Sequence, residues 1–222
     1  MTPKEVFDQI YEMQARLNRY IGRDTLNCPP EYLKDWITDY LWALHDEATE
    51  LSNCFRWKFW DAKVKEDENS RFELYDLKNA KIELIDIIHF FISLCHLTID
   101  SNDNQAIEVL CDLLFPDQLT NDESKTSITN EMKFKTVKQL ISVIMMILDS
   151  IEVQVKSVED IIVPIFILAS HIGTIADILN MTPEEILDVY KKKCEINFKR
   201  QDQNYSMDTK TESDNIKLAK SL

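Results

Sequence analysis

The sequence predicts an all-α protein, and three observations favour this fold class. The chain has 222 residues, of which 45% are hydrophobic, and it contains only two glycines and six prolines. Apolar residues recur three and four positions apart along most of the chain, which is the spacing of an amphipathic helix. The scarcity of glycine also excludes a G-x-G-x-x-G dinucleotide loop and a P-loop, because both need clustered glycines. We expect one compact helical bundle that carries an inserted helical segment.

Three helices are expected in the first half of the chain. Residues 4–21 and 31–54 each carry one apolar stripe at helical spacing, and a loop with Pro29 and Pro30 separates them. A charged stretch at 64–72 is expected to be a loop. The helix at 75–99 is apolar nearly all round, which is typical of a central, buried helix.

The second half begins with a polar stretch, residues 100–136, which we interpret as part of an insertion. Further helices are expected at residues 106–115, 137–155, 158–179 and 183–198. The last of these has a strong start, because Thr182 can cap the helix, Pro183 suits its first turn and Glu185 completes a capping box.

The charge balance restricts the class of partner. The chain has 39 acidic and 25 basic residues, a formal net charge of −14. Such a surface repels duplex nucleic acid unless a basic face is segregated, and no such face is visible, so we expect no nucleic-acid partner.

The cysteines and the apolar runs indicate the compartment. Five cysteines, an odd number without a C-x-x-C pair, are expected to be reduced thiols in an intracellular protein. A cytoplasmic location is expected, with a nuclear or organellar one left open. The longest apolar runs, 140–148 and 161–169, are shorter than the ~20 residues that span a bilayer, so we expect a soluble protein without a membrane partner.

Four carboxylates in two pairs are the most informative residues. Glu47 and Glu50 stand three apart beside the apolar stripe of the second helix, and Glu83 and Asp86 repeat this spacing on the apolar third helix. Buried carboxylates that lie together repel one another, and a divalent cation removes the conflict. Ligation by carboxylates alone favours Mg²⁺, with Mn²⁺ as a substitute, over zinc.

Other interpretations of these acids remain open. An E-x-x-E pair on its own is usually a solvated helix face, and an E-x-x-D pair on an apolar helix can be a buried ion pair with Lys or Arg. A di-iron site is excluded because it needs two E-x-x-H motifs. The chain offers only a single similar pair with this spacing, Asp86 and His89. His89 is therefore expected to be a hydrogen-bonded residue near the site and not a ligand.

Several blocks together resemble a known family. They are Met13 to Asn18, Asp46 to Glu50, Trp57 to Trp60, Glu83 to Phe90, and the spaced set Lys193, Asn197, Arg200 and Tyr205. In this order they are similar to the dimeric, all-α dUTPases, which belong with the MazG proteins to the all-α NTP pyrophosphatase superfamily. The chain departs from the family pattern at Phe198, which is shifted by one place, and at Asn204, where a glycine is usual.

The resemblance implies an activity and an organisation. The activity is Mg²⁺-dependent hydrolysis of dUTP, and of dUDP, to dUMP with release of pyrophosphate or phosphate, which keeps uracil out of DNA and supplies dUMP. A homodimer is also implied. Residues 1–99 and 160–205 would form the catalytic helical core, 100–159 an insertion without an assigned role, and 206–222 a disordered tail.

The resemblance further assigns roles to residues of this chain. Glu47, Glu50, Glu83 and Asp86 would hold the metal, and Glu47 or Glu50 would act as the catalytic base. The substrate-binding residues would include Gln14, Asn18 and Asn197 at the base, Trp57 as a stacking wall, Phe90 at the sugar, and Lys193, Arg200 and Tyr205 at the phosphates. Lys58 and His89 are also expected to bind substrate. Each of these could instead be an ordinary core or surface residue.

Two alternative functions remain at this point. A MazG-like house-cleaning pyrophosphatase would share the acids but prefer another base. A non-catalytic acidic helical adaptor would bind a partner and hydrolyse nothing.

Overall fold

The protein is all-α, as predicted. The computed structural model describes residues 1–116, 128–153, 159–203, 215 and 217–219. Within these ranges the regular elements are helices, and the β pairing is limited to one isolated bridge between Phe55 and Leu74. The helices are α1 (Pro3–Tyr20), α2 (Pro30–Asn53), α3 (Ala62–Glu66), α4 (Leu77–Thr98), α5 (Asn104–Leu114), α6 (Asn130–Val153), α7 (Glu159–Ile178) and α8 (Pro183–Asp202), with short 3₁₀ turns at Thr25–Asn27 and Glu68–Ser70.

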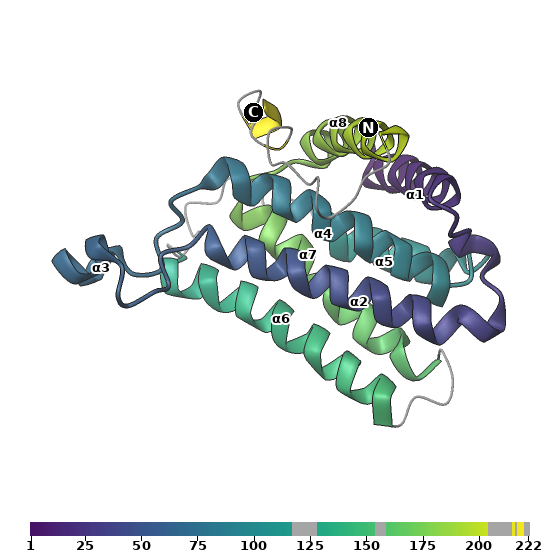
Figure 1. The fold of residues 1–222 in the computed structure, drawn as a ribbon, viewed down its shortest axis with the longest axis horizontal. Coiled ribbons are helices and arrows are strands. Elements are labelled where there is room, and N and C mark those ends of the chain that lie inside the picture. The colour runs from purple at the N-terminus through teal and green to yellow at the C-terminus, as the bar shows by residue number, and fades with distance from the viewer. Residues whose placement is uncertain (117–127, 154–158, 204–214, 216, 220–222) are drawn as a thin grey trace.

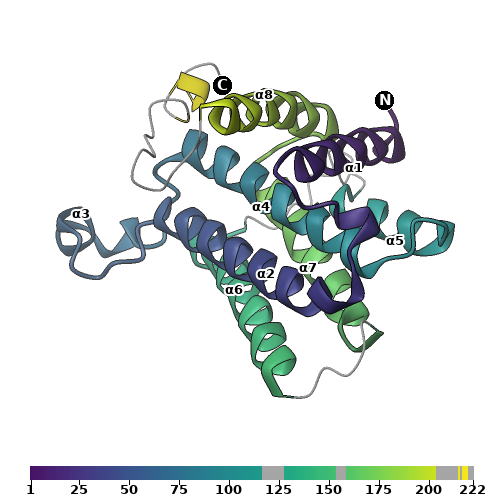
Figure 2. The ribbon, with the colours of Figure 1, turned by 45° about the vertical axis from the view of Figure 1, so that its right-hand side comes forward.

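The apolar helix α4 lies at the centre of the bundle, as its composition predicts. It packs against α2 on one side, against α1 and α8 on another, and against α7 behind (Figures 1 and 2). Most of its side chains from Ala80 to Thr98 are buried. The polar residues Glu83, Asp86, His89 and Ser93 of α4 are therefore held inside the protein.

Two local features differ from the expected elements. A short helix, α3, occupies part of the stretch expected to be a loop, because the Asp61 carboxylate accepts hydrogen bonds from the backbone N–H groups of Lys63 and Val64 and so caps a single turn. In both views α3 lies on an arm outside the bundle (Figures 1 and 2). The other difference is that α6 begins at Asn130, seven residues earlier than expected.

The segment without an assigned role contributes to the core. Helix α6 packs along α2 and α7, and Phe134 at its start stacks on Phe72 with ring centroids 5.0 Å apart. Leu140 and Ile144 on the same helix are fully buried. The segment thus supports α2, which carries two of the four acids, from the side opposite α4.

The start of α8 confirms the capping prediction. The Thr182 side chain accepts from the Glu185 backbone N–H, and the Glu185 carboxylate accepts from the Thr182 backbone N–H. This double cap fixes where α8 begins and hence the direction in which Lys193 and Arg200 point.

The expectation about membrane-spanning length was wrong for α7. Its 18-residue stretch Ile161–Ile178 has a mean hydropathy of 2.0, so one described helix is long and apolar enough to cross a membrane, although half of that stretch is buried inside the protein. Pro164 does not end the helix, and the apolar stretch therefore runs beyond residue 169.

The predicted disordered tail, 206–222, falls mostly outside the described residues. Among those that are described, Asn215 lines a pocket and Leu218 is 5% exposed within the core. The five cysteines, all of which lie in described positions, are unpaired thiols.

Candidate active site

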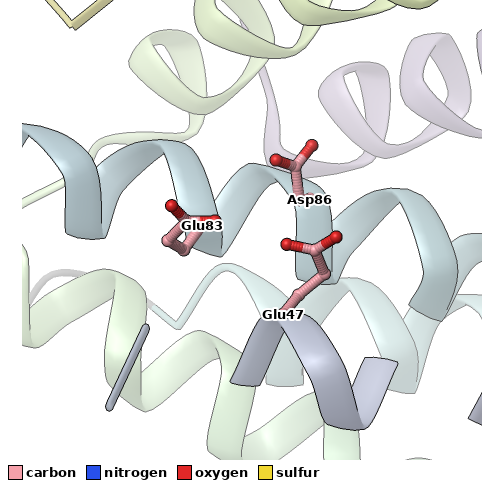
Figure 3. Close-up of side chains that lie close together, drawn as sticks. All are labelled: Glu47, Glu83 and Asp86. Atoms are coloured by element: carbon pink, nitrogen blue, oxygen red, sulfur yellow. The ribbon is translucent and has the colours of Figure 1, made fainter. Parts of the chain in front are cut away.

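Three of the four predicted acids converge between α2 and α4. Glu47 points from α2 toward Glu83 and Asp86 on α4 (Figure 3), and carboxylate oxygens of the three residues lie within 4.8 Å of one another. Glu83 and Asp86 are buried, whereas Glu47 is half-buried. The spacing of three residues on α4 places both of its acids on the face that meets α2.

The electrostatics of this acidic group favour a cation. Burial raises the pKa of Glu47 well above its usual range, and the charges of Asp86 and Glu83 raise it further. Burial also raises the pKa of Glu83, again with help from Asp86. Among the described residues, Glu83 Oε2 is buried without a hydrogen-bond partner. Carboxylates held this close, with an oxygen left unsatisfied, fit a divalent cation.

Glu50, the fourth predicted acid, occupies a different place. It lines the same pocket as Glu47 but is not one of the three acids whose oxygens cluster. Its charge raises the pKa of both Glu47 and Glu83, so it lies near the cluster. The structure thus brings Glu50 to the pocket and leaves it at the edge of the acidic group.

A buried ion pair, the alternative noted for the acids of α4, is also present. Lys193 Nζ lies 2.6 Å from Asp86 Oδ2, and the two side chains are 2% and 11% exposed. Lys193 neutralises one acid of three and lowers the pKa of Glu47 and Glu83. The pair therefore compensates part of the negative charge and leaves the remainder for a cation.

A cavity of about 220 Å³ opens above these acids. Most of the predicted site residues line it, namely Gln14, Asn18, Glu47, Glu50, Asp86, His89, Phe90, Lys193, Asn197 and Arg200. Glu83 belongs to the acidic group but does not line the cavity, and Tyr205 lies outside the described residues. The cavity lining therefore combines acids from α2 and α4 with the cations of α8.

The Gln14 amide is held by protein partners on both sides. Its Nε2 donates to Asn18 Oδ1 at 2.9 Å and to Ser93 Oγ at 3.0 Å. Its Oε1 accepts from the Tyr190 hydroxyl at 2.5 Å and lies 2.7 Å from His89 Nδ1. An amide offers two donors and two acceptor sites, so these four contacts use its full capacity.

The Asn18 amide is held in a similar way. Its Nδ2 donates to Thr25 Oγ1 and to Ser93 Oγ, both at 3.0 Å. By contrast, the structure gives the Asn197 amide no hydrogen-bond partner among the described residues, although Asn197 lines the cavity. Of the three amides predicted to bind the base, Asn197 is therefore the one whose donors and acceptor are available to a ligand.

His89 is a buried neutral residue beside the acids, in agreement with its predicted role. Burial, together with the charge of the nearby Lys193, lowers its pKa to about 3. The ring stacks on Tyr190 with centroids 4.0 Å apart, and Nδ1 contacts Gln14. Because Tyr190 donates to the same Gln14 oxygen, the two aromatic side chains fix the orientation of that amide.

The structure does not bring Trp57 and Lys58 to the cavity. After α2 ends, Phe55 pairs with Leu74 and the chain runs toward the α3 arm. Trp57 packs, partly buried, against the hydrophobic core outside the cavity lining. The Lys58 ammonium lies over the Trp57 ring, 5.5 Å from its centroid. Neither residue lines the cavity, and their contact with substrate stays a prediction.

Sequence reasoning missed several residues of the site. Tyr190, Ser93 and Thr25 complete the amide network, while Tyr40 and Asn215 line the cavity. Tyr190 could have been found, because it stands three residues before Lys193 and so shares its face of α8. Asn215 gave no signal, since it lies in a polar tail beyond every recognised block.

Comparison with known proteins supports an assignment to a family. The model of the dUTPase family matches residues 6–205, which include every predicted site residue and the segment 100–159. A search among curated proteins finds no match. The four acids lie within the matched residues, as does the lining of the cavity apart from Asn215. Since the family model covers most of the chain, the chain belongs to the dUTPase family, whose members are dUTP diphosphatases, a class of hydrolase.

Proposed function

We propose that this protein hydrolyses dUTP to dUMP and pyrophosphate with Mg²⁺, for which Mn²⁺ can substitute, and that it also converts dUDP to dUMP and phosphate. The observation that carries the proposal is a cavity lined both by acids, Glu47 and Asp86 of the clustered three, and by the cations Lys193 and Arg200. A triphosphate with its cation matches this distribution of charge. Removal of dUTP would keep uracil out of DNA and supply dUMP.

The acids would hold the cation and prepare the water. Glu47, Glu83 and Asp86, with Glu50 at the edge, are the residues that would bind Mg²⁺, which when bound neutralises phosphate charge and acidifies a water molecule. Glu47 or Glu50 would accept the proton of the attacking water. The water oxygen would bond to the α-phosphorus while the bond to the bridging oxygen breaks and pyrophosphate leaves.

Helix α8 would bind the phosphates and the base. Arg200 can donate two parallel hydrogen bonds to phosphate oxygens, and Lys193 supplies a point charge. Tyr205 is assigned to the phosphates by the resemblance alone. The free amide of Asn197 can donate to a uracil carbonyl and accept from N3–H, a pattern that cytosine does not match.

Helices α1 and α4 would shape the remainder of the nucleoside pocket. Gln14 and Asn18 would form its polar floor, and they would contact the base only by exchanging a protein partner for it. Phe90 lines the cavity one turn beyond Asp86, where it would pack on the deoxyribose and exclude a 2′-hydroxyl. His89 would stay neutral and hold Gln14.

A nucleotide panel tests the proposal. With Mg²⁺ present, dUTP should be hydrolysed much faster than dTTP, dCTP or UTP, with dUMP and pyrophosphate as products. Preference for another base, or equal rates throughout, would contradict the proposal and favour a house-cleaning pyrophosphatase of the MazG type.

We also propose that the protein is a homodimer. Exposed apolar side chains on α7, of which Val163 is 66% and Ile167 is 38% exposed, offer surface that a second copy could bury. Light scattering would measure the mass in solution, and a mass of a single chain at micromolar concentration would contradict the proposal.

A further inference from the structure

Asn215 contacts both cations of the cavity. Its Oδ1 accepts from Lys193 Nζ at 2.8 Å and lies 3.4 Å from the Arg200 guanidinium nitrogen, which also donates to it. Asn215 itself lines the cavity and is half-buried. One neutral carbonyl oxygen thus accepts a hydrogen bond from each of the two side chains that would hold phosphate.

The residues that follow are attached to the body of the protein. Leu218 is 5% exposed and belongs to the hydrophobic core, and Ala219 packs against that core. These last described residues lie beside α8 in both views (Figures 1 and 2). Burial of a leucine side chain contributes about 1.5–3 kcal/mol toward holding this segment against the protein. Leu218 therefore acts as the anchor for Asn215.

This contact lies outside the part of the chain that the family accounts for. The family match ends at residue 205, ten residues before Asn215. The segment is therefore not needed to explain the shared acids, the cavity or the family activity, and its position against Lys193 and Arg200 calls for a separate explanation.

We propose that residues 215 and 217–219 form an inhibitory strap, in which Asn215 takes the place of a phosphate oxygen at Lys193 and Arg200. The inference rests on the proposed function, because that function makes these cations the phosphate site. An amide oxygen and a phosphate oxygen cannot occupy the same donors together. The strap therefore competes with the polyphosphate of the substrate and leaves the acidic group untouched.

The expected strength of the strap follows from its chemistry. Hydrogen bonds from Lys and Arg to a charged phosphate are about twice as strong as those to a neutral acceptor, so substrate can displace Asn215. Apparent affinity is reduced by the fraction of molecules in which the site is free. The strap should thus raise KM and the dissociation constant of polyphosphate while kcat stays nearly the same.

Paired substitutions at Asn215 test the strap. Asn215→Ala removes the competing oxygen, so inorganic tripolyphosphate with Mg²⁺ should bind roughly three- to tenfold more tightly in calorimetry, as expected for a net loss of one or two hydrogen bonds. Asn215→Asp keeps the shape but adds a charge between the cations, and it should weaken binding by a similar factor. Leu218→Asp, which releases the anchor, should match Asn215→Ala. Gln139→Ala, on an exposed position of α6, is the matched control.

The same variants are then assayed with dUTP. Asn215→Ala should lower KM by a similar factor, with kcat within twofold of the unsubstituted protein. Weaker tripolyphosphate binding or a higher KM in Asn215→Ala would overturn the strap and make Asn215 a residue that helps to hold phosphate. Unchanged binding would overturn it as well, as would a failure of both proteins to bind tripolyphosphate. If dUTP is not hydrolysed but Asn215→Ala tightens tripolyphosphate binding, the proposed substrate fails and the strap stands.

Discussion

Glu83 is the least exposed acid of the cluster. It is 2% exposed, and among the described residues one of its carboxylate oxygens has no hydrogen-bond partner. Asp86 on the next turn is paired with Lys193. An uncompensated buried carboxylate costs several kcal/mol, so its retention in a protein core points to a function that uses the charge.

Substitution of Glu83 tests that function at a single position. Glu83→Gln keeps the shape but removes a ligand charge, so dUTP hydrolysis with Mg²⁺ should fall by at least about 100-fold. The variant should melt in EDTA at no lower a temperature than the unsubstituted protein, because a buried charge has been removed. Glu108→Gln, on the exposed side of α5, is the control and should retain full activity. Activity retained in Glu83→Gln would remove Glu83 from the metal site.

The raised pKa values of Glu47 and Glu83 predict how stability depends on pH. Above the usual glutamate pKa of about 4.3 and below the raised values, the folded chain binds more protons than the unfolded chain. The free energy of unfolding therefore falls as pH rises through neutrality, by up to about 1.4 kcal/mol per pH unit for each carboxylate that resists ionisation. In EDTA, the melting temperature should fall between about pH 6 and pH 8, and Mg²⁺ should reduce that fall.

The variant Glu47→Gln isolates the effect. The substitution removes one titrating carboxylate from the cluster of Glu47, Glu83 and Asp86. The melting temperature of the variant in EDTA should therefore depend less steeply on pH. An equally steep dependence would show that the decline arises elsewhere in the protein.

At the scale of elements, α5 and α7 approach so closely that only glycine fits between them. A Cβ atom placed on Gly173 would lie 2.0 Å from the backbone carbonyl oxygen of Leu113. Backbone atoms of a helix cannot shift as a flexible side chain can. The tight contact locks α5 to α7 and so fixes one end of the bundle behind α4.

Substitution of Gly173 should therefore destabilise the protein despite the higher helix propensity of alanine. Gly173→Ala should lower the free energy of unfolding by at least about 1–3 kcal/mol, measured by urea titration. Thr174→Ala, on the next and exposed position of α7, is the control and should change it by about 0.5 kcal/mol or less. Equal stability of the two variants would show that the α5–α7 contact can widen at little cost.

Helices whose positions are set by neighbouring residues could be predicted from the sequence, whereas contacts between distant segments could not. Periodicity placed α1, α2 and α4 within a few residues, and the Thr182 capping box located the start of α8, because spacing and caps act over single turns. Helix α3 was missed because one side chain, Asp61, creates it. The packing of α6 on α2 was not predictable, since it depends on contacts such as Phe72 with Phe134 that join distant parts of the sequence.

The candidate site shows the same limit. Spacing alone indicated that Glu83 and Asp86 share a face, and the structure adds that Glu47 meets them. The destination of Trp57 depended on where the chain turns after α2, which residue patterns do not encode. Asn215 belongs to the tail, whose composition is that of a solvated segment, and its contact with Lys193 arises only in three dimensions.

At the scale of the whole molecule, the cavity joins helices that are distant in the sequence. Its lining comes from α1, α2, α4 and α8 together with Asn215 near the C-terminus. A ligand that binds across these elements stabilises the folded chain and has no comparable site in the unfolded chain. Binding should therefore be visible as global stability, and this separates an enzyme of the proposed kind from an adaptor that binds no nucleotide.

A non-hydrolysable dUTP analogue with Mg²⁺ should accordingly raise the melting temperature. At a concentration 100 times its dissociation constant, the analogue should stabilise the fold by about 2.7 kcal/mol. The corresponding dCTP analogue at the same concentration should raise it less, because cytosine presents the wrong donors and acceptors to Asn197. Glu83→Gln, which loses a cation ligand, should lose most of the shift. Equal shifts with both analogues would contradict discrimination between uracil and cytosine, and the lack of any shift would contradict nucleotide binding in this cavity.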